Sequence, residues 1–284
     1  MSAFRPRTAV GKAAMTAIIE HPTDTLLALD FDGTLAPIVD DPELAYADPD
    51  AVAALARVGG LLGWIVLITG RPAAVAVRLG GFRDHAGLES MIVLGQYGVE
   101  RWDAATDTFR LPAEPNAIAA VKDEIRSVLE THHAPAARIE HKGRAIAVHT
   151  RGLDDPSGTL RRLSGPLVDL ARRHGLVVEP GRQVLEIRAP GMDKGKALRS
   201  IVAETGARQV IFAGDDLGDL PAFQAVQQLR DQGMPGLLVC SASIEEKALE
   251  QISDLLVDGP AGLAAWLTDL AEAIMERGRA SANR

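Results

Sequence analysis

Apolar segments of strand length alternate with segments of helical spacing over most of the chain. The apolar segments predict strands at Thr25–Phe31, Trp64–Thr69, Met91–Gly95, Gln209–Ala213, Gly236–Cys240 and Asp254–Val257. Between them, apolar residues recur at helical intervals in Asp50–Val58 and in Lys194–Glu204, and Gly206 ends the second of these helices. Strands that are apolar throughout and alternate with helices are typical of a parallel sheet covered on both faces. The pattern therefore predicts an α/β fold with a Rossmann-like, doubly wound parallel sheet.

The segment from about residue 104 to residue 188 does not follow this alternation of apolar strands and helices. A predicted helix at Ala117–Glu130 is followed by stretches in which polar and apolar side chains alternate. Ile146 and Val148 face one way, whereas Ala147 and His149 face the other. Such alternation is typical of an open sheet with one covered face and one solvated face. We therefore expect an α+β domain at residues 104–188, inserted into a core of residues 1–103 and 189–284.

The composition narrows the class of protein. A chain of 284 residues with 47% hydrophobic and 24% charged residues is globular and long enough for two domains. Its net charge of −8 argues against a nucleic-acid partner, and the single cysteine, Cys240, excludes an internal disulfide and a cysteine-based zinc site. No apolar stretch is long enough to span a membrane, and no export signal is evident. We expect a soluble cytoplasmic protein whose residues after Met275 fray.

Two carboxylates follow the first predicted strand. Asp30 and Asp32 come directly after the apolar run Leu26–Leu29, and Gly33 permits a sharp turn behind them. In an open parallel sheet, ligands bind beyond the carboxyl ends of the strands. Because two close carboxylates repel each other, either a cation lies between them or one retains a proton. The pattern favours a metal site or a general acid over an acidic turn that merely caps the next helix.

Three further predicted strand or helix ends carry polar residues. Thr69 ends the second strand and Arg71 follows it; a hydroxyl and backbone N–H groups there can hold a phosphate, although a plain helix cap explains them about as well. Lys194 opens a helix, where the helix dipole disfavours a cation, so an anion is expected nearby. Another predicted strand is followed by carboxylates whose oxygens suit a hard cation such as Mg²⁺: Asp215, Asp216 and Asp219.

In this order, these four motifs resemble those of the haloacid dehalogenase superfamily of phosphotransferases. Asp30-x-Asp32-x-Thr34 is similar to its first motif, Thr69 to its second and Lys194 to its third; the fourth is matched by Gly214-Asp215-Asp216-x-x-Asp219. The inserted segment lies where this superfamily places a type-2 cap. The resemblance covers the whole core and implies a phosphotransferase core with an inserted cap.

A closer resemblance is to the trehalose-6-phosphate phosphatases, on residues 27–38, 68–72, 95–100, 140–151 and 184–188. In that family, the sugar hydroxyls are read by cap residues that match Glu140, Lys142, Arg151, Arg182 and Glu186. The chain departs from the family pattern at Gly218 and Leu220, where Thr and Glu are usual, and at Tyr97, where His is usual. These departures affect substrate detail more than the phosphate chemistry.

The resemblance implies an Mg²⁺-dependent phosphatase that converts trehalose 6-phosphate into trehalose and phosphate, the last step of trehalose biosynthesis. It implies Asp30 as the nucleophile that forms an aspartyl-phosphate and Asp32 as the general acid and base. Thr69 and Lys194 then bind phosphate oxygens. The metal is expected on Asp30, the Asp32 backbone carbonyl and Asp215, with Asp216 holding metal-bound water or the loop. Arg71 is expected to contact the substrate, and the supporting residues are Gly33, Thr34 and Asp219.

Two other functions stay open on the sequence. A related capped sugar phosphatase with another phosphosugar substrate differs only in its cap residues, so the core motifs do not exclude it. A catalytically silent sugar-phosphate-binding protein shares the same fold, although intact Asp30 and Asp32 argue against it. In each case the expected partner is a small molecule rather than a nucleic acid or a membrane.

Overall fold

The chain divides into two compact units. The computed structural model describes residues 5–113, 115–181, 183–191, 193–241 and 248–282. The first unit comprises residues 1–110 and 193–284, and the second comprises residues 111–192. The insert thus begins at residue 111 rather than at the predicted 104, because residues 108–110 form a strand that pairs with the sheet of the first unit. It ends at residue 192 rather than at 188.

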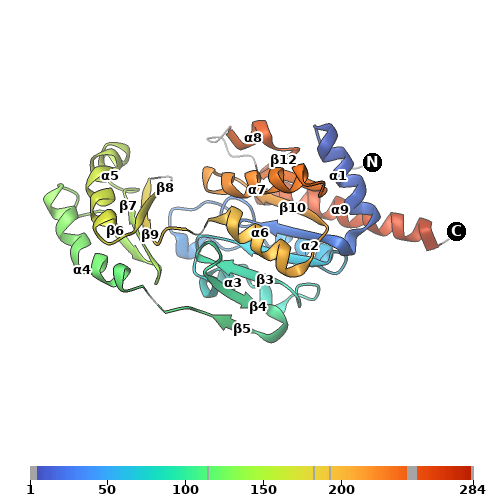
Figure 1. Ribbon diagram of the computed structural model, residues 1–284, viewed down its shortest axis with the longest axis horizontal. Coiled ribbons are helices and arrows are strands. Elements are labelled where there is room, and N and C mark those ends of the chain that lie inside the picture. Colours follow the sequence, from blue (N-terminus) through green and yellow to red (C-terminus); the bar gives the residue numbers. More distant parts are fainter. Residues whose placement is uncertain (1–4, 114, 182, 192, 242–247, 283–284) are drawn as a thin grey trace. The chain divides into compact units, whose positions relative to one another are not determined.

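The first unit is built on a mixed sheet of eight strands among the described residues (Figure 1). Across the sheet the order is β12 (Leu255–Val257), β11 (Gly236–Ser241), β10 (Gln209–Gly214), β1 (Thr25–Leu29), β2 (Trp64–Ile68), β3 (Ile92–Gly95), β4 (Glu100–Asp103) and β5 (Thr108–Arg110). The strands from β12 to β3 are parallel, and every residue of β1 and β10 is buried, as their apolar sequences require. The predicted parallel sheet is confirmed; the polar antiparallel edge strands β4 and β5 were not predicted.

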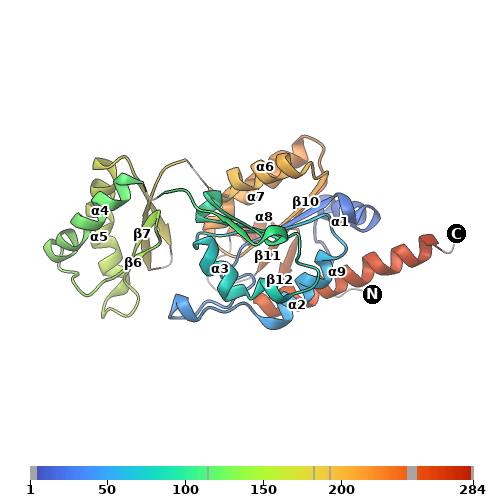
Figure 2. The ribbon, with the colours of Figure 1, turned by 90° about the horizontal axis from the view of Figure 1, so that it is seen from below.

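Helices cover both faces of this sheet (Figure 2). One face packs against α1 (Ala9–Glu20), α2 (Pro49–Gly59), α3 (Ala73–Gly80) and α9 (Gly259–Ala282). The other packs against α6 (Lys194–Thr205), α7 (Leu220–Asp231) and α8 (Ala248–Ile252). Cys240 of β11 packs into the core on this second face, and burial raises the pKa of its thiol to about 12, which disfavours the thiolate that a nucleophile needs. This layered arrangement is the doubly wound fold that the sequence predicts.

The C-terminal helix continues beyond the point where fraying was expected. α9 runs to Ala282, so the prediction of a frayed tail after Met275 is wrong for the described residues. Leu270 and Ile274 anchor the helix on the core, and extending an existing helix needs far less free energy than starting one. Arg277 also contacts Glu20 of α1 at 3.3 Å. No helix in the described ranges has both the length and the apolar content to cross a bilayer.

The second unit is an antiparallel sheet with helices on one face. Its strands lie in the order β6 (Arg138–His141), β7 (Ala145–His149), β9 (Val184–Arg188) and β8 (Val177–Gly181). The apolar face packs against α4 (Asn116–Thr131) and α5 (Pro156–Arg173) through Ile146, Val148 and Ile187. The other face carries the polar members of the alternating pattern. An α+β insert with one covered sheet face is therefore what the alternation indicates.

Candidate functional site

The predicted catalytic residues of the first unit meet at one edge of its sheet. β10, β1 and β2 are neighbours, and their carboxyl ends lead directly to Asp215, Asp30 and Thr69. All three residues are buried. Because adjacent parallel strands end side by side, residues far apart in the sequence come together at this edge.

Three buried carboxylates lie close together, and two of them pair with the amino group of Lys194. Asp30, Asp215 and Asp219 each place one oxygen within 4.8 Å of the other two. The Lys194 Nζ atom lies 2.7 Å from an Asp30 oxygen and 2.7 Å from an Asp219 oxygen. Lys194 is the first residue of α6, so the anion expected near it from the sequence is this carboxylate pair. One lysine cannot neutralise three buried carboxylates.

The pKa values of this cluster express that excess of negative charge. Burial and then repulsion by Asp219 raise the pKa of Asp215 to about 10. Burial also raises the pKa of Asp30 well above its usual range, against the opposing attraction of Lys194. Burial acts to lower the pKa of Lys194, but the charges of Asp219 and Asp30 raise it overall. A buried set of oxygen donors with excess negative charge fits a hard divalent cation.

The acidic loop after β10 divides its carboxylates between two tasks. Asp219 accepts hydrogen bonds from Lys194 Nζ and from the backbone N–H of Asp215, at 2.7 and 2.9 Å, so both its oxygens are engaged. The exposed Asp216 carboxylate accepts the N–H of Gly218 at 2.8 Å and is not part of the three-carboxylate group. Asp30 and Asp215 are thus the members of that group whose oxygens can hold a cation, while Asp219 holds Lys194.

Asp32 forms a bidentate ion pair with Arg71. Its two carboxylate oxygens accept hydrogen bonds from Arg71 Nε and Nη2 at 2.7 and 2.6 Å. Arg71 also donates to the carbonyl of Pro42 at 2.9 Å, and its guanidinium lies 5.5 Å from the ring centre of Phe31. The structure therefore does not bring the Asp32 side chain into the group of three carboxylates. It pairs the predicted general acid with the residue expected to contact the substrate.

The loop that follows Asp30 is closely packed against its surroundings. Thr34 is fully buried, and its hydroxyl has no hydrogen-bond partner among the described residues. Gly33 has a φ of +72°, and its backbone carbonyl accepts a hydrogen bond from Ser241 at 2.7 Å. A Cβ atom at Gly33 lies 2.0 Å from an Asp215 oxygen. The supporting role expected of Gly33 thus has a steric basis, since only glycine admits the Asp215 carboxylate.

Gly33→Ala is expected to weaken cation binding more than it weakens the fold. The left-handed φ costs about 1 kcal/mol for alanine, and the new methyl group also displaces Asp215 from the cluster. Titration of Mg²⁺ monitored by thermal melting measures both effects. Gly206→Ala is the matched control, because Gly206 has a φ of +68° and nothing within 4 Å of its Cβ position. Equal Mg²⁺ affinity in the two variants contradicts the steric role.

The polar face of the second unit gathers most of the predicted sugar-binding residues. In the strand register, Glu140 and Glu186 lie on either side of Ala147 of β7. Lys142 Nζ lies 2.6 Å from Glu186 Oε2. Arg151 is half-buried two residues beyond the end of β7, whereas Arg182 lies outside the described residues. The structure therefore brings Glu140, Lys142 and Glu186 to one face.

A histidine not predicted to be functional also belongs to this face. His149 Nε2 lies 2.7 Å from Glu140 Oε2. Burial acts to raise the pKa of Glu140, but this hydrogen bond and the charge of Lys142 lower it to about 2. The alternation along β7 places His149 beside Ala147, and that pattern was the available indication. Glu186, only 6% exposed, keeps one oxygen, Oε1, without a hydrogen-bond partner among the described residues.

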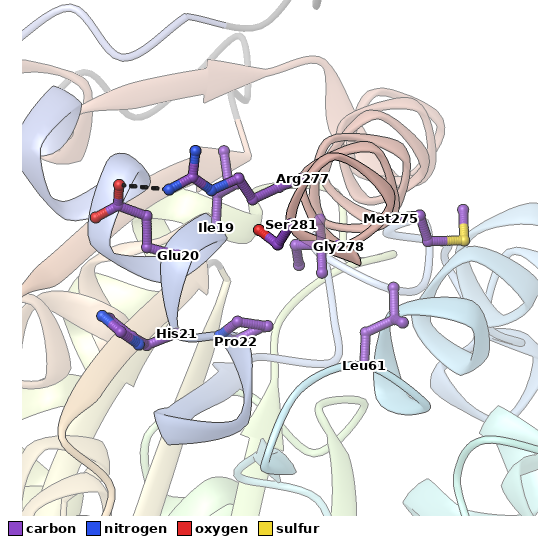
Figure 3. A pocket seen from close by; sticks show the side chains of 10 residues that line it. Ile19, Glu20, His21, Pro22, Leu61, Met275, Arg277, Gly278 and Ser281 are labelled. Atoms are coloured by element: carbon purple, nitrogen blue, oxygen red, sulfur yellow. Dashed lines mark hydrogen bonds and ion pairs between the residues drawn. The ribbon is translucent and has the colours of Figure 1, made fainter. Parts of the chain in front are cut away.

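A separate cavity of about 670 Å³ lies at the other end of the core sheet (Figure 3). It is lined by the end of α1, the turn before β1 and the last turns of α9, with the Glu20–Arg277 ion pair at its side. Pro22 precedes the amino end of β1, whereas Asp30 follows the carboxyl end. This cavity is therefore not part of the carboxylate site.

Comparison with known proteins identifies the family of the chain. The sequence profile of the trehalose-phosphatase family matches residues 28–257. A trehalose-phosphate phosphatase of Mycolicibacterium paratuberculosis is 31% identical over 260 residues, which cover 88% of this chain and 62% of the relative. The chain thus spans less than two thirds of that relative's length.

Solved structures share the fold. The C-terminal domain of Candida albicans trehalose-6-phosphate phosphatase matches 96% of this chain and 99% of its own, with a TM-score of 0.72 at 18% identity. A haloacid dehalogenase-like hydrolase from Bacteroides thetaiotaomicron matches 87% of this chain and 99% of its own, with a TM-score of 0.56 at 17% identity. With a family profile that covers most of its length, the chain belongs to the trehalose-phosphatase family.

Proposed function

We propose that this protein hydrolyses trehalose 6-phosphate to trehalose and inorganic phosphate through an aspartyl-phosphate on Asp30. The observation that carries the proposal is the buried cluster of Asp30, Asp215, Asp219 and Lys194 at the carboxyl edge of the sheet. Membership of the trehalose-phosphatase family supports the substrate class. The intact carboxylates make a silent binding protein the weaker alternative.

We assign the divalent cation, Mg²⁺, to Asp30, Asp215 and the backbone carbonyl of Asp32. The excess of buried carboxylates over lysines and the all-oxygen donor set fit such an ion. When bound, Mg²⁺ supplies positive charge that offsets the charge of the phosphate oxygens. Asp216 remains a predicted contributor to this site. In the structure its carboxylate accepts a hydrogen bond from the Gly218 N–H of the same loop.

The chain's own residues carry both steps of the reaction. An Asp30 carboxylate oxygen attacks phosphorus, the bond from phosphorus to the sugar oxygen breaks, and Asp32 gives that oxygen a proton. Asp32 then takes a proton from water as the water oxygen attacks phosphorus. The bond between phosphorus and Asp30 breaks, phosphate leaves, and the Asp30 carboxylate is restored.

Three residues support the phosphate during these steps. Lys194 is charged and adjacent to Asp30, and it attracts the phosphate oxygens. Thr69 accepts the N–H of Arg71 through its hydroxyl oxygen at 3.1 Å, so its own proton can be donated to phosphate. Arg71 must leave Asp32 before Asp32 can carry a proton, and the phosphate is the natural acceptor for the released guanidinium.

We assign recognition of the sugar to the polar face of the second unit. Carboxylates and cations in fixed pairs suit the many hydroxyl groups of a disaccharide. Glu140 and Glu186 are held by His149 and Lys142, and Glu186 keeps one oxygen for a ligand hydroxyl. Arg151 and Arg182 remain predicted contributors.

A panel of sugar phosphates tests the proposal directly. Purified protein with Mg²⁺ is expected to release phosphate from trehalose 6-phosphate with a higher kcat/KM than from glucose 6-phosphate. A malachite-green assay of free phosphate measures both. Equal activity on the two esters contradicts the disaccharide assignment and favours another phosphosugar substrate.

Glu186→Gln is expected to raise the KM for trehalose 6-phosphate about tenfold, which corresponds to the loss of one hydrogen bond to a charged group. Hydrolysis of p-nitrophenyl phosphate, which lacks the sugar, should be unchanged. Glu124→Gln is the matched control, because Glu124 pairs with Arg173 and His174 between the helices of the same unit. A similar KM in wild type and Glu186→Gln rules out a sugar-binding role for Glu186.

A further inference from the structure

The turn that follows β3 has an unusual backbone. Gln96 and Tyr97, within the 3-10 turn Gln96–Gly98, have φ angles of +49° and +59°. Non-glycine residues rarely adopt this left-handed conformation, and two in succession are strained. Such strain persists where surrounding contacts enforce it, and it is concentrated at functional sites.

The contacts that enforce it are made with the loop after β2. The Tyr97 N–H donates to the carbonyl of Thr69 at 3.0 Å, and the Gln96 N–H donates to the carbonyl of Arg71 at 2.9 Å. The Gln96 side-chain amide donates to the carbonyl of Gly70 at 2.9 Å. The strained turn therefore holds all three successive carbonyls of Thr69–Arg71.

Holding these carbonyls orients the N–H groups of the same loop. In a planar trans peptide the C=O and N–H bonds point in opposite directions. With the Thr69 and Gly70 carbonyls turned toward Gln96 and Tyr97, the N–H groups of Gly70 and Arg71 point to the opposite side. The Thr69 hydroxyl lies on that side, because it accepts the Arg71 N–H at 3.1 Å. Because the Arg71 N–H is engaged by the Thr69 oxygen, the Gly70 N–H and the Thr69 hydroxyl proton are the donors that this side of the loop offers to an anion.

The surrounding side chains leave this arrangement little freedom. Gln96 is only 4% exposed. A Cβ atom at Gly70 lies 2.8 Å from the Tyr97 hydroxyl, so the tyrosine ring packs directly over Gly70. Glu100 accepts the N–H of Ala73 at 2.7 Å and thereby caps α3, which has no side-chain cap of its own. The segment after β3 thus braces the loop and the helix that follows it.

We propose that Gln96 and Tyr97 are positioning residues that orient the Thr69–Arg71 loop to bind the phosphate group. The proposal rests on the phosphate site of the proposed function and adds the device that holds it in shape. Gln96 is the sharper test, because its side-chain amide is the donor to the middle carbonyl.

Two substitutions remove that donor with little change in shape. Gln96→Glu replaces the NH₂ group by an oxygen that repels the Gly70 carbonyl, and Gln96→Met replaces it by an apolar group. The readouts are the inhibition constant of inorganic phosphate and the KM and kcat for trehalose 6-phosphate, measured on the full chain with Mg²⁺. We expect the inhibition constant to rise about tenfold or more in both variants, together with KM, through loss of one hydrogen bond.

Gln209→Glu separates this effect from simple destabilisation. Gln209 is also buried, accepts a hydrogen bond from Thr25 at 3.2 Å, and lies at the amino end of β10, away from the carboxylate edge. The Gln209→Glu variant should melt at a lower temperature than the wild type, but phosphate should inhibit the two proteins equally. The proposal is overturned if both Gln96 variants are inhibited as strongly as wild type. A wild type that neither hydrolyses the ester nor is inhibited by phosphate refutes the proposed function itself.

Discussion

Asp30→Asn is expected to lower phosphate release from trehalose 6-phosphate about ten-thousand-fold or more. The amide cannot attack phosphorus, and the loss of a nucleophile removes the covalent route altogether. Binding of the substrate should persist, because Lys194, Thr69 and the polar face of the second unit are unchanged. Phosphate release measures the loss, and calorimetric titration of the substrate measures the retained binding.

The same substitution should leave the fold intact. Burial, opposed by Lys194, raises the pKa of Asp30, so folding of the metal-free protein disfavours the charged form of this side chain relative to its neutral form. Asparagine resembles that neutral form, and Lys194 keeps Asp219 as its partner. The metal-free melting temperature near neutral pH should therefore not fall. Asp24→Asn, at the amino end of β1, is the control and should retain activity. Substantial phosphate release by Asp30→Asn refutes the nucleophile assignment.

Removal of the divalent cation is expected to abolish activity. The metal-free protein is then expected to become less stable as pH rises. The pKa of Asp215 is about 10 in the folded protein and 3.8 for the free side chain. Between these values the folded state binds more protons than the unfolded state, so the free energy of unfolding falls as pH rises. Below pH 3.8 both states carry the proton, and this contribution is fully present.

Mg²⁺ should offset that trend. The ion replaces the proton on the carboxylates, so its affinity increases with pH. At a free concentration about 100 times its Kd, it adds about 2.7 kcal/mol to the free energy of unfolding. Melting curves at about pH 6 and about pH 9, with EDTA and with Mg²⁺, should show the larger stabilisation by Mg²⁺ at the higher pH.

Asp215→Asn supplies the control for this result. The variant lacks one of the carboxylates with a raised pKa and one of the proposed metal ligands. Its melting temperature should therefore depend less on pH than that of the wild type, and Mg²⁺ should stabilise it far less. Full activity of the wild type after exhaustive chelation contradicts the metal assignment.

Much of the fold could be predicted from local pattern. The buried strands β1, β2 and β10 are apolar at every position, and such runs between helical segments have few other solutions than a covered parallel sheet. The edge strands β4 and β5 were missed because their sequences are short and mostly polar. They form because they pair with β3 and with each other, which is a tertiary effect. The C-terminal helix was underestimated for the same reason, since its last turns extend a helix anchored on the core.

The motifs at strand ends and at one helix start were enough to predict that Asp30, Thr69, Lys194 and Asp215 lie near one another, because a parallel sheet brings the carboxyl ends of its strands to one edge. The partners of these residues depend on distances that no local pattern specifies. Arg71 forms an ion pair with Asp32, and His149 is hydrogen-bonded to Glu140. The Gln96 side chain donates a hydrogen bond to the Gly70 carbonyl, 26 positions away in the chain. Local sequence thus determined the buried parallel strands and the chemical groups that follow them. The pairing of those groups was settled by packing, because hydrogen bonds and ion pairs depend on three-dimensional separation rather than on order along the chain.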